Sequence, residues 1–331
     1  MQPDQIRPRI RRRAFGVVLS ASLLPALEPA RAQPAKSRIA IPLGGEQFLY
    51  LVDALKQGMR EQGVPDGSVE YDVGFTQGEV QREERVVADL LARRPAAIVI
   101  AGPPFVRAAL KLTRTVPILM ANVSNPVGNG FIDSLARPGG NVTGVATLYE
   151  TVLPKVAEVL VEIVPSASRI AVLLNENSPS TGSFWQAAEA ALRTLGKTPV
   201  RMKASSEAQV GQAFEEMREA RVQTAIVVAD VTFVSLRDRI AAMAKALQIP
   251  TAYAMREHVL AGGLVSYGPS LSGNFHAAAR YVAQILKGAR PAELPVEQPT
   301  RSELVLNRGA ARSLGLTIPS SVMLRVDEVI E

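Results

Sequence analysis

The sequence predicts an α/β fold in which two Rossmann-like lobes, each with a parallel sheet, are joined by a multi-strand hinge. Short apolar runs alternate with amphipathic stretches along the chain, which is typical of β-α-β units around parallel sheets. The same order of runs then occurs a second time further along the chain. A length of 331 residues suits two such domains better than one.

The first half of the chain contains five apolar runs that predict strands, and a helical pattern follows each of the first three. Phe48, Leu51, Leu55 and Met59 recur at helical spacing after the first run. The expected strands are Arg38–Leu43, Val69–Val73, Ala96–Ala101, Val116–Ala121 and Val142–Thr147. The expected helices are Glu46–Gln62, Val80–Leu91 and Phe105–Leu112.

Three segments of the first half have counterparts in the second half, in the same order. Residues 37–41, 97–101 and 116–118 resemble residues 168–172, 225–229 and 249–251, at offsets of 131, 128 and 133 residues. Nearly constant offsets favour duplication of one lobe over coincidence between similar strands.

The N-terminal residues predict an export signal. Five arginines (Arg7, Arg9, Arg11, Arg12, Arg13) precede an apolar run over 14–27, and Ala30-Arg31-Ala32 then offers a cleavage site before Gln33. Arg12-Arg13-Ala14-Phe15 resembles a twin-arginine signal, so twin-arginine export and ordinary secretion both stay open. We therefore expect a signal peptide over 1–32, cleavage near Ala32 and a periplasmic protein.

The charge of the remaining chain argues against nucleic acid as a partner. Residues 1–32 carry six of the 37 basic and two of the 31 acidic residues, which leaves 31 basic and 29 acidic residues beyond the signal. A chain so close to neutral lacks the basic excess of nucleic-acid-binding domains. Since it has no cysteine, its stability has to come from burial without disulfides.

The pattern also predicts where the lobes begin and end. We expect an N-terminal lobe over 33–148 plus about 270–295, a C-terminal lobe over 149–269, and a segment over 296–331 that crosses the hinge. Hinge crossings are expected within 148–151, 268–272 and 295–302.

The residue inventory gives little support to an enzyme. The two histidines, His258 and His276, lack metal-ligand spacing, and Ser266 lacks the glycine pattern of a nucleophile turn. Gly44-Gly45 lacks the third glycine of a dinucleotide fingerprint. We therefore expect no catalytic residue, no metal and no cofactor.

Polar residues gather directly after the predicted strands, where open parallel sheets bind ligands. An acid at the end of a buried strand, such as Asp230, needs a cationic partner. The expected ligand-binding residues are Gly45, Glu46, Gln47, Gly102, Pro103, Asn122, Asn175, Asp230, Tyr253 and Tyr267. Taken singly, Asn, Asp and Ser at strand ends are usually caps or turns, so loop or helix-cap chemistry stays open as the explanation of each position.

Several motifs resemble the ABC-transporter substrate-binding family that includes tryptophan- and tyrosine-binding receptors. They are 134–144 (Ser-Leu-Ala-Arg-Pro-Gly-Gly-Asn-Val-Thr-Gly), 261–268 (Ala-Gly-Gly-Leu-Val-Ser-Tyr-Gly), the tail 314–319 and the closing 325–330. The resemblance implies a type I periplasmic binding protein fold, a small ligand in the cleft, and delivery to an ABC permease and ATPase in the inner membrane. It further implies that Asp230 binds a ligand amine, with Asn122, Asn175 and Tyr267 in the same cleft.

The expected function is therefore a monomeric solute-binding protein for a small ligand, with amino-acid-like and aromatic compounds as candidates. The family often has hydroxyl residues where this chain has Gly44-Gly45-Glu46-Gln47, which puts an aromatic amino acid in question. Glu46 would favour an amine-bearing ligand if it faces the cleft. A periplasmic sensory receptor and an enzyme using cleft carboxylates are the alternatives.

Overall fold

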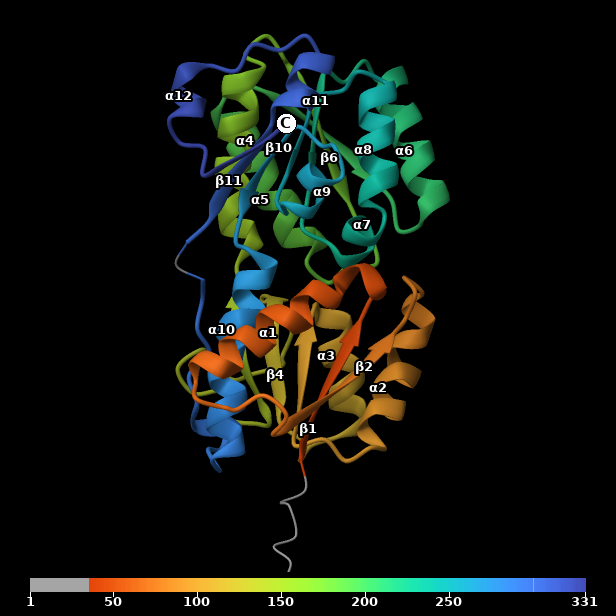
Figure 1. Ribbon diagram of the computed structural model, residues 1–331. Coiled ribbons are helices and arrows are strands. Elements are labelled where there is room, and N and C mark those ends of the chain that lie inside the picture. Colours follow the sequence, from red (N-terminus) through yellow and green to blue (C-terminus); the bar gives the residue numbers. More distant parts are fainter. Residues whose placement is uncertain (1–35, 300) are drawn as a thin grey trace, which may run out of the picture. The chain divides into compact units, whose positions relative to one another are not determined.

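The computed structural model describes residues 36–299 and 301–331 (Figure 1). The expected signal peptide and its cleavage site lie outside these residues. Within them the chain forms two lobes, each built on its own sheet. None of the helices in the described ranges has the length and apolarity needed to cross a membrane.

The N-terminal lobe contains a five-stranded sheet in the order β2-β1-β3-β4-β5, and all of its strand pairs are parallel. The strands are β1 (Ser37–Leu43), β2 (Val69–Phe75), β3 (Ala97–Ala101), β4 (Ile118–Ser124) and β5 (Val142–Thr147). β4 runs three residues beyond its predicted end because Val123 and Ser124 still pair with β5 after a register shift. That extension carries Asn122 and Ser124 to the edge of the sheet that faces the other lobe.

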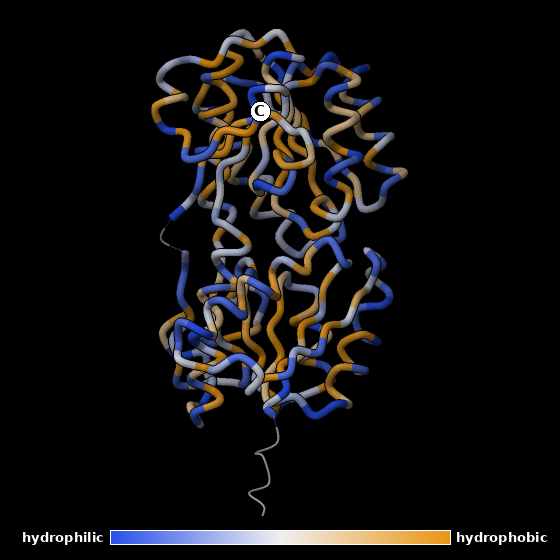
Figure 2. The backbone as a smooth tube through the Cα atoms, in the orientation of Figure 1, coloured by the Kyte–Doolittle hydropathy of each residue, from blue (hydrophilic) through white to orange (hydrophobic). Residues whose placement is uncertain are grey.

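Helices cover both faces of this sheet. α1 and α10 pack together and against one face, while α2 and α3 pack against the other. Their bounds are α1 (Leu49–Glu61), α2 (Glu83–Leu91), α3 (Pro103–Leu112) and α10 (Leu271–Leu286), with 3-10 turns η1 (Glu46–Phe48) and η2 (Val80–Arg82) ahead of α1 and α2. Successive residues of β1 alternate between the faces: Ile39 and Ile41 join the core under α1, and Ala40 joins the core under α2 and α3. Figure 2 shows the apolar residues concentrated on such strands.

The C-terminal lobe repeats this topology. Its seven-stranded sheet has the order β12-β11-β10-β9-β8-β6-β7, so that β7-β6-β8-β9-β10 match β2-β1-β3-β4-β5. The strands are β6 (Arg169–Leu174), β7 (Thr198–Lys203), β8 (Thr224–Val227), β9 (Thr251–Tyr253), β10 (Val265–Gly268), β11 (Glu303–Asn307) and β12 (Glu328–Ile330). The segments that resemble one another in sequence belong to equivalent strands, β1 with β6, β3 with β8 and β4 with β9, so the repeat in the sequence coincides with a repeat of the lobe topology.

One strand pair departs from the parallel pattern. β11 pairs antiparallel with β10, whereas the other pairs of this sheet are parallel. The helices of this lobe are α4 (Tyr149–Ile163), α5 (Thr181–Thr194), α6 (Glu207–Glu219), α7 (Val231–Ser235), α8 (Arg237–Ala246), α9 (Glu257–Leu260), α11 (Arg308–Ser313) and α12 (Ser320–Met323). α4 and α5 pack together against the sheet. α6 and α8 form a second packed pair, and α6 contacts β7.

The chain passes from one lobe to the other between β5 and α4, between β10 and α10, and before β11. The third passage follows the 3-10 turn η3 (Pro291–Glu293) and a bridge between Val145 of β5 and Glu297. α10 belongs to the N-terminal lobe although it follows β10 in sequence, because it packs on α1 and β4 (Figure 1). Crossings of this kind let two rigid lobes rotate about a short set of backbone bonds.

Candidate functional site

A cavity lies where the two lobes face each other. It encloses about 870 Å³ of empty space, part of which is open to solvent, and both lobes line it. The lining residues are Gly44, Thr76, Gly78, Glu83, Gly102, Pro103, Pro104, Phe105, Asn122, Ser124, Tyr149, Asn175, Asn177, Ser178, Ala229, Asp230, Val231, Thr232, Ser235 and Met255.

The carboxyl ends of the strands form this cavity. In the N-terminal lobe, every strand contributes a lining residue at or just after its end. In the C-terminal lobe, the segments after β6, β8 and β9 do the same. Parallel strands place these ends along one edge of each sheet, so that two facing lobes enclose a space between two such edges.

Five of the sequence-predicted site residues line the cavity: Gly102, Pro103, Asn122, Asn175 and Asp230. They come from both lobes. Gly102 and Pro103 follow β3, and Asp230 follows β8, which is the equivalent strand of the C-terminal lobe. Asn122 and Asn175 add amide groups at the ends of β4 and β6.

The other five predicted residues lie away from the cavity lining. Glu46 and Gln47 are exposed in the first turn after β1, and Gly45 lies beside them in extended backbone. Tyr253 is fully buried and stacks on His258, with ring centroids 4.7 Å apart. Tyr267 lies on β10. Strand β9 lies between β10 and β8, the strand that leads to Asp230.

Asn122 is held in place by two donors. Its Oδ1 accepts hydrogen bonds from Tyr149 Oη at 3.1 Å and from Asn274 Nδ2 at 2.9 Å. Both partners lie just beyond interlobe crossings, at the starts of α4 and α10. The hydrogen bonds among the described residues leave Asn122 Nδ2 unused, which provides a donor at the cavity wall.

Asp230 caps a helix and faces the cavity. Its Oδ1 accepts from Thr232 N and from Asn175 Nδ2, each at 2.9 Å, and so it forms the N-cap of α7. Burial raises the pKa of this carboxyl, while the bonds from Asn175 and Thr232 oppose that shift. Asn175 therefore joins the ends of β6 and β8 through a side-chain contact.

Glu83 is a site residue that the sequence analysis missed. It occupies the first turn of α2 and lines the cavity from the N-terminal lobe. Burial and the negative charge of Asp230 raise its pKa to about 7, and Arg107 opposes this shift. Residues 79, 83 and 84 are all glutamates, and the sequence alone does not show which of them faces the cavity.

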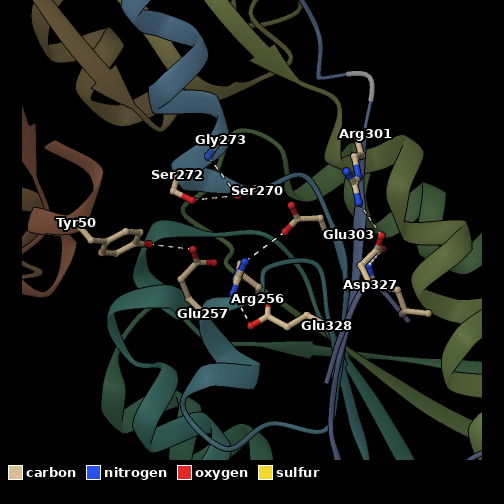
Figure 3. A network of polar contacts seen from close by, with 11 residues as sticks. Tyr50, Arg256, Glu257, Ser270, Ser272, Gly273, Arg301, Glu303, Asp327 and Glu328 are labelled. Atoms are coloured by element: carbon tan, nitrogen blue, oxygen red, sulfur yellow. Dashed lines mark hydrogen bonds and ion pairs between the residues drawn. The ribbon is translucent and has the colours of Figure 1, made fainter. Parts of the chain in front are cut away.

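Further hydrogen bonds join the lobes beside the bond between Tyr149 and Asn122. Tyr50 Oη of α1 donates to Glu257 Oε1 of α9 at 2.9 Å (Figure 3). The hydroxyl oxygens of Ser124 and Ser180 lie 3.0 Å apart and are buried. Beside Glu257, Arg256 bonds Glu328 at 2.8 Å and Glu303 at 3.4 Å, which fixes α9 to β11 and β12. Among the described residues, side-chain hydrogen bonds therefore connect the lobes at Tyr50–Glu257, Ser124–Ser180 and Tyr149–Asn122.

The cavity lining mixes polar, acidic and apolar side chains. In the part of the chain that the structure describes, no group of three or more His, Cys, Asp or Glu side chains is arranged to hold a metal ion. The lining combines amides, hydroxyls and two carboxylates with the apolar side chains of Phe105, Val231 and Met255. Such a mixture can orient a small molecule that has both a charged group and an apolar body.

Comparison with known proteins gives one family over almost the whole described chain. The family described as ABC transporter substrate binding protein matches residues 36–330. The tyrosine-binding protein of Clostridioides difficile (strain R20291) is 22% identical over 270 residues, which cover 80% of this chain and 77% of that protein.

Two solved structures share the fold. A domain from Streptococcus pneumonia in complex with L-Trp has a TM-score of 0.81 at 23% identity, covering 89% of this chain and 100% of that one. A conserved domain protein from Vibrio cholerae has a TM-score of 0.82 at 26% identity, covering 89% and 99%. Both similarities span the two lobes and the segments that join them.

Proposed function

Because the chain belongs to the ABC transporter substrate binding protein family, we propose that it is the exported receptor of an ABC importer. It binds a small ligand between its lobes and delivers that ligand to a permease and its ATPase. The cavity carries this proposal, because its lining comes from the strand ends of both lobes. A ligand that contacts both lobes stabilises the closed arrangement that a permease can recognise.

The ligand carries a positively charged amine, and amino-acid-like compounds are the first candidates. A tyrosine-binding relative and a fold neighbour in complex with L-Trp support this choice. Asp230 is the partner for the amine, because a partly desolvated carboxylate gains from a cation beside it. Asn122 and Asn175 orient the rest of the ligand through neutral hydrogen bonds.

The protein acts as a monomer in the periplasm and releases its ligand unchanged. The arginine-rich, apolar N-terminal segment with its small-residue cleavage pattern supports export.

Native mass spectrometry of the purified protein, followed by a melting-temperature screen of amino acids and amines, tests this function. A ligand at 100 times its Kd adds about 2.7 kcal/mol to the free energy of unfolding. We expect at least one compound to stabilise the protein and to be recovered chemically intact. Recovery of an altered compound would favour an enzyme, and stabilisation by none of the compounds would contradict a receptor for this class of ligand.

A further inference from the structure

The cavity wall carries negative charge without a matching cation. Glu83 from the N-terminal lobe and Asp230 from the C-terminal lobe both line it, and among the described lining residues there is no Lys, Arg or His. Arg107, which acts on Glu83, is an exposed residue of α3 outside the lining. A ligand with one ammonium and one carboxylate adds no net charge and leaves the charge of the wall uncompensated, whereas a second cationic group reduces it.

Glu83 is the member of this acid pair that lacks a partner. Within the described ranges, its half-buried carboxylate forms neither an ion pair nor a hydrogen bond. Glu84, the next residue of α2, is paired with Lys111 at 2.9 Å on the surface, and Asp230 accepts two hydrogen bonds within its own lobe. A half-buried carboxylate without such partners gains from a cation beside it. Glu83 therefore presents an unsatisfied carboxylate to the ligand from the N-terminal lobe.

Donors for a ligand carboxylate gather around Asp230. Ser235, at the end of the helix that Asp230 caps, lines the cavity, and its Oγ is buried without a hydrogen-bond partner among the residues described. Asn177 lines the cavity two residues after Asn175, which bonds Asp230. Asn122 Nδ2 adds a donor from the facing lobe. The ammonium and carboxylate of an α-amino acid share one carbon, so their partners must be neighbours, and these residues meet that need.

Apolar surface in the same cavity suits an aliphatic side chain. Phe105 of the N-terminal lobe and Val231 and Met255 of the C-terminal lobe line it. The two lobes come close here, since a Cβ on Gly102 would lie 2.9 Å from Val231 Cγ2. A long aliphatic stem can pack on such surface while the charged group at its end reaches a polar partner. The cavity therefore offers a place for each part of an amino acid with a cationic side chain.

From these observations we propose that the ligand is a basic amino acid, with a side chain like that of lysine or arginine, and that Glu83 determines this specificity. Asp230 binds the α-ammonium, and Ser235 and Asn122 donate to the α-carboxylate. Glu83 binds the cationic end of the side chain from the opposite lobe, so that the ligand connects the two lobes. This inference rests on the proposed function, because it names the ligand class of the same cavity.

A role of Glu83 in binding the side-chain cation makes that binding dependent on pH. Burial and the charge of Asp230 raise the pKa of Glu83 to about 7 in the empty cavity, and a bound cation favours its ionised form. Binding near neutral pH is therefore coupled to loss of a proton, so the affinity rises as the pH rises through 7. The other charged groups on α2 and on the elements packed against it include Arg107 on α3, the pairs Arg82–Glu79 and Lys111–Glu84, and Asp72 of β2 with its partners Arg38 and Arg93.

Matched ligand pairs test the proposal by isothermal titration calorimetry of the purified protein at pH 8. L-citrulline has the shape of L-arginine with a neutral end group, and L-norleucine lacks the terminal ammonium of L-lysine. We expect each basic amino acid to bind about tenfold more tightly than its neutral counterpart, because only the basic one pairs with Glu83. Glu83→Gln should remove this preference by weakening the basic amino acids, and it should abolish the rise of their affinity between pH 6 and 8.

Glu84→Gln is the control, because it removes the same charge from the adjacent, surface-paired residue of α2. It should keep both the preference and the pH dependence of the unmodified protein. A preference for the basic member in at least one pair, lost in Glu83→Gln alone, supports the proposal. The proposal is overturned if the neutral members bind as tightly, if neither basic amino acid binds, or if Glu83→Gln keeps the preference. Tight binding of neutral amino acids would overturn the ligand class and leave the receptor function in place, whereas binding of no amino acid or amine would count against that function itself.

Discussion

At the level of single residues, Asp230 combines a structural and a binding role. One oxygen caps α7 and accepts from Asn175, which holds the loop after β8 against the loop after β6. The carboxylate nevertheless lines the cavity and is only partly shielded by those donors. Removing the whole side chain would disturb both the helix cap and the cavity wall. Removing its charge alone leaves the cap in place and tests the binding role.

Asp230→Asn should weaken ligand binding by about 1.5–3 kcal/mol while the protein remains folded. The amide keeps an oxygen that can accept from Thr232 N, but it loses the negative charge that pairs with the ligand cation. Calorimetry measures the affinity. Asp238→Asn makes the same change on exposed α8 and should leave the affinity as it was. Equal affinities for the two variants would remove Asp230 from the site.

His258 is a buried residue that carries a pH dependence of stability. It is fully buried against Tyr253, and burial lowers its pKa to about 4. Below pH 6.5 the unfolded chain takes up a proton that the folded protein does not, so stability falls as the pH falls. The folded protein accepts this proton only near pH 4, where the loss is complete.

We expect His258→Phe to remove this acid-side loss, which amounts to about 3 kcal/mol between pH 6.5 and 4. Phenylalanine preserves the stacked ring and cannot be protonated. Urea titrations at several pH values give the free energy of unfolding. His276 is partly exposed beside Glu61, so His276→Gln is the control and should retain the loss of stability at acid pH. A loss of the same size in His258→Phe would contradict the assignment of that loss to His258.

The site residues show which side chains a sequence can place. Asn122, Asn175 and Asp230 directly follow apolar runs of the sequence, so the ends of those runs were enough to predict that they line the cavity. Tyr253 also ends a strand, but its ring points into the core, where Gly263 makes room for it: a Cβ on Gly263 would lie 2.4 Å from the ring. Glu46 and Glu83 are both first-turn acids, and only the packing of their helices turns one out and the other in.

At the level of elements, contacts between helices of different lobes stabilise the observed arrangement. Tyr50 on α1 bonds Glu257 on α9, and Glu257 is buried with a raised pKa. The bond exists only while α1 and α9 are close, so it favours the closed form over an open one. Arg256 forms ion pairs with Glu303 and Glu328, which hold α9 against the strands of its own lobe. The position of Glu257 beside Tyr50 is therefore fixed.

Tyr50→Phe should lower the ligand affinity about fivefold, mainly through faster dissociation, because the closed form loses a hydrogen bond worth about 1 kcal/mol. Stopped-flow measurements separate the two rate constants. Tyr71→Phe on β2 removes a phenol from the half-buried side of the N-terminal lobe and serves as the control. Identical dissociation rates in both variants would show that the Tyr50 contact does not hold the lobes together.

Most elements were predictable because apolar periodicity decides them locally. The paired segments of the repeat gave β1 with β6, β3 with β8 and β4 with β9. The antiparallel addition of β11 was not predictable, since its pairing with β10 depends on where the chain returns from the other lobe. The extension of β4 to Ser124 depended in the same way on a register shift against β5.

For the whole molecule, the account depends on two equivalent lobes that trap a ligand between their strand ends. The same strand order in both lobes puts two polar, amide-bearing edges face to face. A ligand bound to both edges lowers the free energy of the closed form relative to an open one. The bond of Tyr50 to Glu257 across the lobes contributes from outside the cavity lining.

The distance between the lobes, measured with and without ligand, tests this claim most directly. The sequence has no cysteine, so the exposed positions in Asp89→Cys on α2 and Glu219→Cys on α6 can be spin-labelled selectively. Helices α2 and α6 belong to different lobes and lie on the same side in Figure 1. Double electron–electron resonance should show a broad distance distribution that becomes shorter and narrower when a tight ligand is added. A distribution that stays unchanged at saturating ligand would contradict closure around a ligand.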